Sequence, residues 1–196
     1  MMKHVPNILT VFRILLIGVY LIVFYSDLQY ATLYAVGIFL FAGVTDVLDG
    51  YLARKYDVES KFGQIADPFA DKGMQLTTLF TLSSKGFIDK WIPYLILAKE
   101  LFLIISGAIL LLYKTKIIIP SNIFGKATTV LIYVAIIISV ISGTGILKIE
   151  APIVEYIFIG VVIFAGITLF QYIGIGIQKL KSFYKGDKKE AQEANV

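Results

Sequence analysis

Long apolar stretches separated by short polar turns occupy most of the chain. Each stretch is about 20 residues long, the length that an α-helix needs to cross the hydrocarbon core of a bilayer. Prolines near the starts of several stretches fit helix N-termini, where a missing N–H group costs little. The pattern therefore predicts six transmembrane helices, at residues 8–25, 30–52, 64–83, 91–113, 125–142 and 153–177.

The composition agrees with this pattern. Of the 196 residues, 58% are hydrophobic and only 16% are charged, whereas about 25% of the residues of a soluble domain are charged. The mean hydropathy is +0.81. We expect an all-α integral membrane protein, a six-transmembrane-helix bundle formed by one domain, residues 1–178. The charged segment 179–196 is expected to be a cytoplasmic tail that frays into disorder.

Lysine and arginine residues gather on one side of the predicted bundle. They lie in the turn after the second stretch, at Arg54, Lys55 and Lys61, and throughout the tail. Because positively charged loops stay in the cytoplasm, we expect a multi-pass protein of the cell membrane with both termini and the second turn on the cytoplasmic side. The net charge of +4 is concentrated on that side, where it either suits an anionic leaflet or reflects only this topogenic bias, with no lipid specificity. The basic residues therefore give no support to a nucleic-acid partner.

Four aspartates interrupt the apolar pattern around the second turn: Asp46, Asp49, Asp67 and Asp71. At 100° per residue, the first two fall on one helical face, and the last two, four apart, fall on one face of the next helix. An aspartate at the centre of a membrane helix costs at least ~2.5–3.5 kcal/mol, so four of them require compensating charge. With no cysteine and His4 as the only histidine, the carboxylates favour a hard cation, Mg²⁺ or Mn²⁺. Aspartates that only cap helices or face solvent have no reason to keep helical spacing.

The same segment follows the pattern D-x2-D-G-x2-A-R-x8-G-x3-D-x3-D without departure, at Asp46, Asp49, Gly50, Ala53, Arg54, Gly63, Asp67 and Asp71. In this it resembles the CDP-alcohol phosphotransferases. The N-terminal PNILTVFR, the AKE at residues 98–100 and the GKATT at residues 125–129 are most similar to phosphatidylglycerophosphate synthases. The resemblance covers residues 3 to about 145.

The resemblance implies an enzyme that transfers the phosphatidyl group of CDP-diacylglycerol, with CMP as the leaving group. It implies that the four aspartates hold two divalent ions, that Asp71 is also the base for the acceptor hydroxyl, and that the protein is a homodimer in membrane lipid. Gly50 and Gly63 would let the nucleotide approach the backbone, and Arg54 would bind the diphosphate. Asn7 and Thr10 lie near the nucleotide in that family, or they cap the first helix.

The resemblance also suggests an acceptor site at Lys99, Lys126 and Thr129. A phosphate-bearing alcohol needs such basic groups, and glycerol 3-phosphate is the acceptor of the most similar enzymes. However, Lys99 stands where they have arginine, and Thr128 stands where they have a second lysine. This weaker positive charge leaves phosphatidylglycerol, the acceptor of cardiolipin synthases, as the alternative. A non-catalytic membrane cation carrier is a third interpretation, against which Arg54 and the two glycines argue, because ion transport does not require them.

Overall fold

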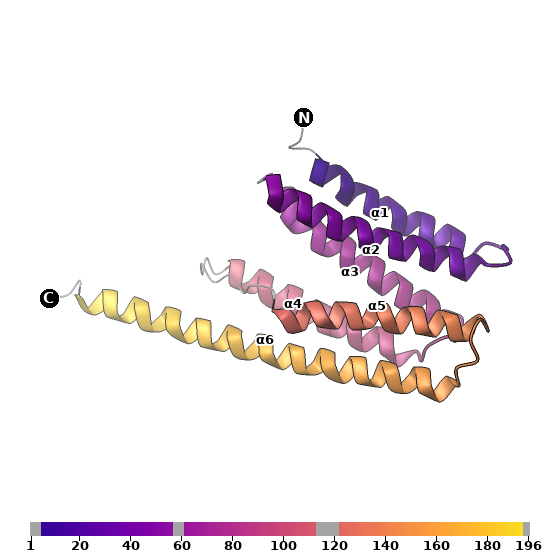
Figure 1. Cartoon of the computed structure of the whole chain (residues 1–196). Helices are drawn as coiled ribbons and strands as arrows, with labels where there is room; N and C mark the ends of the chain where they lie inside the picture. Colours follow the sequence, from indigo (N-terminus) through magenta and orange to yellow (C-terminus); the bar gives the residue numbers. More distant parts are fainter. Residues whose placement is uncertain (1–4, 57–60, 113–121, 194–196) are drawn as a thin grey trace. The chain divides into compact units, whose positions relative to one another are not determined.

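The computed structural model is all-helical and contains six helices in its described part: α1 (Val5–Phe24), α2 (Ala31–Tyr56), α3 (Lys61–Ser84), α4 (Trp91–Leu112), α5 (Ile123–Gly143) and α6 (Ala151–Glu193) (Figure 1). The structure describes residues 5–56, 61–112 and 122–193, and the side chains of residues 10–48, 69–107 and 122–180. The all-helical class and the number of helices predicted from the apolar stretches are confirmed. The first five helices agree with the predicted ranges within a few residues.

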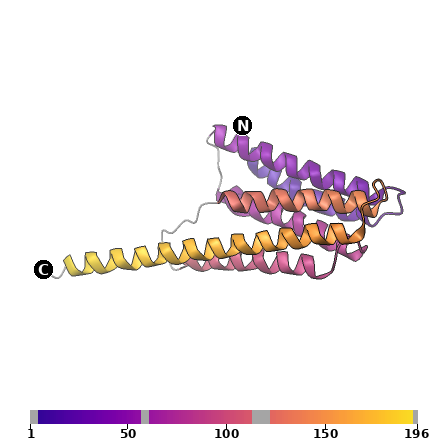
Figure 2. The ribbon, with the colours of Figure 1, turned by 60° about the horizontal axis from the view of Figure 1, so that its bottom comes forward.

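The last helix differs from its prediction. We expected disorder after Lys179, but α6 continues without a break to Glu193, 43 residues in all, and runs as one rod in both views (Figures 1 and 2). Lysine, glutamate, alanine and glutamine are good helix formers. Adding a residue to an existing helix also costs far less than starting a new one. The expectation of a disordered tail is therefore wrong for these residues.

By length and composition, three helical segments of the described part of the chain could cross a membrane: Ala31–Leu48, Ile123–Gly143 and Ala151–Leu180. The segment Thr10–Phe24 is a shorter apolar helix. Many apolar side chains of these helices are exposed, for example Ile22 at 75% and Phe170 at 75%, as expected for surfaces that face lipid. This is a membrane protein with several apolar helices. That all six helices cross the bilayer stays a prediction.

The chain divides into two compact units, which are described separately. The first contains Met1–Pro93 and Ile136–Glu155 and the second contains Tyr94–Ala135 and Tyr156–Val196. In the first unit, α1 packs against both α2 and α3, and α2 also contacts α3 (Figure 2). The contact between α1 and α3 is close at Gly73, where an added Cβ atom would lie 3.3 Å from the Ile17 side chain.

The buried residues of the first unit form continuous helical seams. On α2 the seam is Ala35, Phe39 and Ala42, and the same three- to four-residue spacing next reaches Asp46. On α1 it is Phe24, Tyr20, Arg13 and Thr10. Each seam therefore begins as an apolar or aromatic surface and becomes charged or polar toward the end of the unit that carries the aspartates.

The opposite end of the first unit is held by polar contacts to α3 and the turn after it. The Tyr20 and Thr81 hydroxyls lie 2.6 Å apart in a buried hydrogen bond. Beyond them, the Lys85 ammonium donates to the Phe24 carbonyl at 3.1 Å and to the Thr32 hydroxyl at 3.3 Å. The ammonium also lies 4.3 Å from the centre of the Phe24 ring. Lys85 thus caps the C-terminal end of α1, where the exposed carbonyl groups attract a positive charge.

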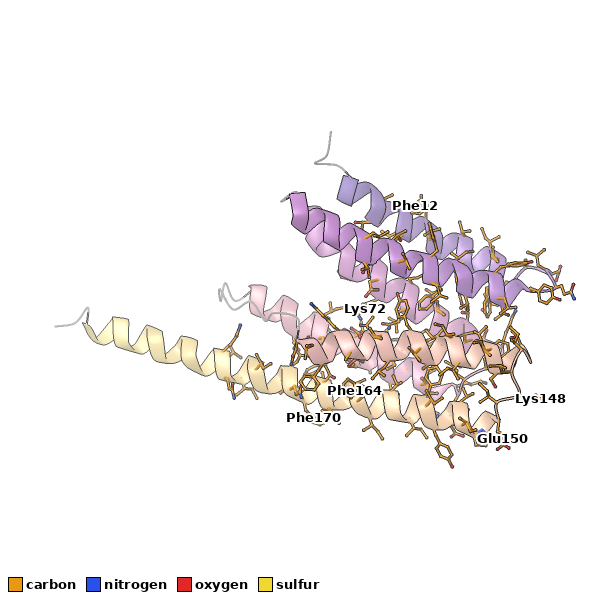
Figure 3. The ribbon with its side chains drawn as sticks, in the orientation of Figure 1. Phe12, Lys72, Lys148, Glu150, Phe164 and Phe170 are labelled. Carbon is orange, nitrogen blue, oxygen red and sulfur yellow. The ribbon has the colours of Figure 1, made fainter. Side chains whose placement is uncertain are left out.

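In the second unit, buried residues recur along one face of α6 at Phe158, Val161, Ala165 and Thr168, and α6 contacts the first turns of α5. The Thr128 and Thr168 hydroxyls lie 3.1 Å apart, and the rings of Phe124 and Phe164 lie 6.2 Å apart. Phe164 therefore faces α5, whereas Phe170 on the same helix is exposed (Figure 3). The next position on this face of α6 is Tyr172, which reaches the start of α5.

Candidate active site

The acidic motif lies on two helices that contact each other. Asp46 and Asp49 are in α2, and Asp67 and Asp71 are in α3, and these helices also share α1 as a neighbour. The predicted placement of the aspartates on two successive helices is confirmed. The side chains of Asp49, Gly50, Arg54, Gly63 and Asp67 lie outside the described residues, so their predicted roles stay predictions.

Asp46 forms an ion pair with Arg13 of α1. The Arg13 side chain is 3% exposed and that of Asp46 is 38% exposed. A buried guanidinium requires a counter-ion, and Asp46 supplies one from a helix 33 residues further along the chain. Arg13 thus holds the Asp46 carboxylate on the side of α1, and the rest of the Asp46 side chain remains partly exposed.

Asp71 lies on α3 with a side chain that is 22% exposed. The ammonium of Lys72 is 3.7 Å from its carboxylate and 3.5 Å from the side-chain oxygen of Gln75. Gln75 is fully buried, and its side-chain nitrogen has no hydrogen-bond partner among the described residues. A polar group therefore continues the face of Asp67 and Asp71 by one more turn, and Lys72 partly neutralises that face.

Two residues of α1 were linked to the nucleotide by resemblance. Thr10 is completely buried on the same α1 seam as Arg13, so it faces the helices that carry the motif. It lies well inside α1, which begins at Val5, so the alternative of capping the first helix does not apply to it. The side chain of Asn7 lies outside the described residues.

The donor atoms present fit a divalent hard cation. Asp46 and Asp71 provide carboxylate oxygen on contacting helices, and the chain contains no cysteine. Within the described side chains no three acidic or histidine groups gather to hold an ion, and the side chains of Asp49 and Asp67 are not among them. The family that the motif resembles uses divalent metal.

The predicted acceptor residues lie in the second unit. Lys99 is 10% exposed, and its ammonium is 2.8 Å from the carboxylate of Glu100, so its charge is already compensated. Lys126 is exposed in the first turn of α5 and has no ion pair or hydrogen bond from its side chain to any described residue. Thr129 donates to the Gly125 carbonyl at 3.4 Å. Thr128 is buried against α6. Of these residues, Lys126 has the charge best available to a ligand.

Sequence reasoning gave no role to Arg13 or Gln75. For Arg13 a signal existed, because an arginine inside an apolar stretch must find a negative partner in the membrane. For Gln75 the signal was its position four residues after Asp71, on the face already defined by Gly63, Asp67 and Asp71. Neither signal identifies the partner, which depends on how the helices pack.

Comparisons with known proteins agree with this site. The CDP-alcohol phosphatidyltransferase family profile matches residues 3–171. A CDP-diacylglycerol–glycerol-3-phosphate 3-phosphatidyltransferase of Rickettsia typhi is 34% identical over 174 residues, which are 87% of this chain and 97% of that protein. A probable phosphatidylglycerophosphate synthase of Mycobacterium tuberculosis is 34% identical over 154 residues, which are 77% of this chain and 72% of that protein. The match extends through most of the apolar part of α6, beyond the resemblance noticed in the sequence. The chain belongs to the CDP-alcohol phosphatidyltransferase family.

Proposed function

We propose that this protein transfers the phosphatidyl group of CDP-diacylglycerol to glycerol 3-phosphate, which gives phosphatidylglycerophosphate and CMP. The observation that carries the proposal is the complete eight-position motif on the contacting helices α2 and α3. The near-full-length similarity to a protein named for this reaction supports it.

The reaction is a displacement at phosphorus. The acceptor hydroxyl loses its proton to Asp71, its oxygen forms a bond to the β-phosphorus of the donor, and the bond from that phosphorus to CMP breaks. Asp71 suits the role of base because its carboxylate remains partly exposed, at 22%, and can be reached by a hydroxyl group. Arg54 is assigned to the diphosphate and Gly50 and Gly63 to the close approach of the nucleotide.

The aspartates would hold the metal. Asp46, Asp49, Asp67 and Asp71 are assigned as ligands of Mg²⁺ or Mn²⁺, with two ions expected, and when bound these would neutralise the diphosphate charge. Arg13 orients Asp46, and Lys72 lies beside Asp71. The acidic group therefore already has cationic neighbours from the chain itself before any ion binds.

The acceptor's phosphate is assigned to Lys126, with Thr129 and Lys99 as further candidates. Lys126 is the member of this set that is exposed and has no described partner for its charge. A lysine ammonium binds phosphate oxygen through charge-assisted hydrogen bonds.

Phosphatidylglycerol is the second candidate acceptor, with cardiolipin as product. Two observations favour it: Glu100 compensates Lys99, and Thr128, in place of a lysine, is buried against Thr168. The phosphodiester of phosphatidylglycerol carries one negative charge, so it demands fewer basic groups than the phosphate monoester of glycerol 3-phosphate.

We propose the membrane topology and the oligomeric state of the protein on the same basis. The distribution of lysine and arginine supports a multi-pass protein of the cell membrane with the motif and both termini on the cytoplasmic side. Family membership supports a homodimer.

The test is a transfer assay with purified protein in mixed micelles that contain CDP-diacylglycerol and Mg²⁺ or Mn²⁺. Glycerol 3-phosphate and phosphatidylglycerol are supplied in separate reactions, and CMP and the lipid products are measured by mass spectrometry. We expect phosphatidylglycerophosphate from the first and no cardiolipin from the second. Cardiolipin alone would establish the second candidate, and ion flux into liposomes without CMP release would establish a carrier.

A matched pair of variants assigns the activity to the motif. Asp71→Asn removes the proposed base, whereas Asp27→Asn makes the same change at an exposed residue in the turn between α1 and α2. Only the first is expected to abolish CMP release. Loss of activity in both would indicate damage to the preparation rather than a role of the motif.

A further inference from the structure

The start of α5 is tied to α6 by two side chains at one level of α6. The hydroxyl oxygen of Tyr172 accepts a hydrogen bond from the backbone N–H of Asn122 at 2.9 Å. The side-chain amide of Asn122 donates to the side-chain oxygen of Gln171 at 3.3 Å. Asn122 precedes the first residue of α5, and its carbonyl accepts the N–H groups of Gly125 and Lys126 at 3.0 and 3.2 Å.

These contacts make Asn122 an unusual helix cap. Asparagine is favoured at this position because its side chain usually accepts an N–H of its own helix. Here its described side-chain hydrogen bond goes to another helix instead. Gln171 and Tyr172 therefore determine where the first turn of α5 lies in relation to α6.

The glycine of the first turn fits the same arrangement. A Cβ atom added at Gly125 would lie 2.6 Å from the Tyr172 hydroxyl oxygen and 3.5 Å from its ring carbons. Any other residue would have to displace this oxygen. Gly125 thus leaves room for the Tyr172 hydroxyl, and Lys126 is the very next residue.

We propose that Tyr172 is a positioning residue for the acceptor site: its hydroxyl fixes the first turn of α5 and thereby the location from which Lys126 binds the acceptor's phosphate. This inference rests on the proposed function of Lys126. The family match ends at Gln171, so Tyr172 lies just outside the segment shared with the family profile.

The test combines Tyr172→Phe, Gly125→Ala and the double variant. Tyr172→Phe keeps the ring but removes the hydrogen bond to Asn122, and we expect the KM for the acceptor to rise about 2- to 10-fold. Gly125→Ala should raise it further, because the new methyl group meets the hydroxyl oxygen. In the double variant that oxygen is absent, so the KM should return toward the value of Tyr172→Phe. The KM for CDP-diacylglycerol should stay unchanged in all three.

Matched controls remove the general effects of each substitution. Tyr156→Phe makes the same change on α6 at a side chain that is 70% exposed, and should leave both KM values unchanged. Gly166→Ala places a methyl group where nothing lies within 4 Å. It should leave the melting temperature unchanged or raise it, because alanine favours helix over glycine, whereas Gly125→Ala should lower it.

The melting temperatures test the contact between Tyr172 and the first turn of α5, and the KM values test its role in acceptor binding. If Tyr172→Phe does not relieve the effect of Gly125→Ala on the melting temperature, the hydroxyl does not fix this turn and the proposal is wrong. If the two substitutions are coupled in stability but neither changes the KM for the acceptor, the contact is structural only, and the positioning role is overturned. If the wild type uses neither glycerol 3-phosphate nor phosphatidylglycerol, the proposed function fails, while the melting temperatures still decide whether Tyr172 holds the turn.

Discussion

Replacement of Arg13 by methionine tests how the acidic end of the first unit is stabilised. Methionine keeps a long apolar side chain on the α1 seam but removes the guanidinium that pairs with Asp46. The Arg13 side chain is 3% exposed, so the pair is shielded from water on this side, whereas Asp46 is 38% exposed and regains some hydration when the arginine is lost. A hydrogen bond between charged groups contributes about 1.5–3 kcal/mol, below the 3–5 kcal/mol typical of a fully buried pair.

The expected change can be measured by thermal unfolding in detergent without divalent metal. For a chain of this size, about 1.5–3 kcal/mol corresponds to a melting temperature lower by about 3–12 °C. Arg13→Lys, which keeps the charge but loses the planar donor group, should lose less than Arg13→Met. The double variant Arg13→Met with Asp46→Asn should unfold above Arg13→Met alone, because it no longer contains the uncompensated carboxylate.

Divalent metal provides the second part of this test. A bound cation would supply positive charge beside Asp46, so Mn²⁺ should raise the melting temperature of Arg13→Met more than that of the wild type. Unfolding of Arg13→Met at the wild-type temperature in metal-free buffer would refute the stabilising role of the pair. An identical Mn²⁺ effect on both proteins would show that the ion and Arg13 do not act on the same carboxylate.

Three further predictions concern the motif aspartates, Lys126 and Lys85. Asp71→Asn should abolish transfer but keep part of the CDP-diacylglycerol binding, whereas Asp67→Asn should weaken both, as measured by CMP release and donor binding; equal loss of binding would assign Asp71 to metal binding alone. Lys126→Ala should raise the KM for the acceptor about 10- to 100-fold with little change for the donor, while the exposed Lys148→Ala should have no effect, and equal KM values in both would remove Lys126 from the acceptor site. Lys85→Met should lower the melting temperature by about 2–4 °C through loss of roughly 1 kcal/mol at the end of α1, and no change would show that its contacts to Phe24 and Thr32 are unimportant.

Much of the fold could be predicted because membrane helices have a strong local signal. A helix that crosses a bilayer must satisfy its own backbone groups, so apolar length alone locates it. The same regularity placed Asp46 and Asp49 on one helix and Asp67 and Asp71 on the next. The end of α6 was missed because composition describes whether a segment can fold alone, whereas residues after Lys179 continue a helix that already exists.

Contacts between helices could not be predicted in the same way. Arg13 and Asp46 meet only because α1 packs against α2, and Asn122 and Tyr172 are 50 residues apart. Local periodicity indicates which face of a helix is buried but not which residue of another helix lies opposite. Gly125 illustrates the limit: its presence beside Lys126 is visible in the sequence, but the oxygen that an added Cβ atom would meet there belongs to α6.

The unbroken course of α6 has a mechanical consequence. From Tyr172 to Glu193 the helix advances about 30 Å at 1.5 Å per residue, and this stretch contains no proline and no loop. A rotation of the helix at Tyr172 is therefore expected to rotate a spectroscopic label attached near Glu193 as well. One residue inserted after Lys179 would rotate the far end by about 100° while Tyr172 keeps its place. The direction of the label can thus be chosen without a change at Tyr172, and the label can report on the first turn of α5 without contacting it.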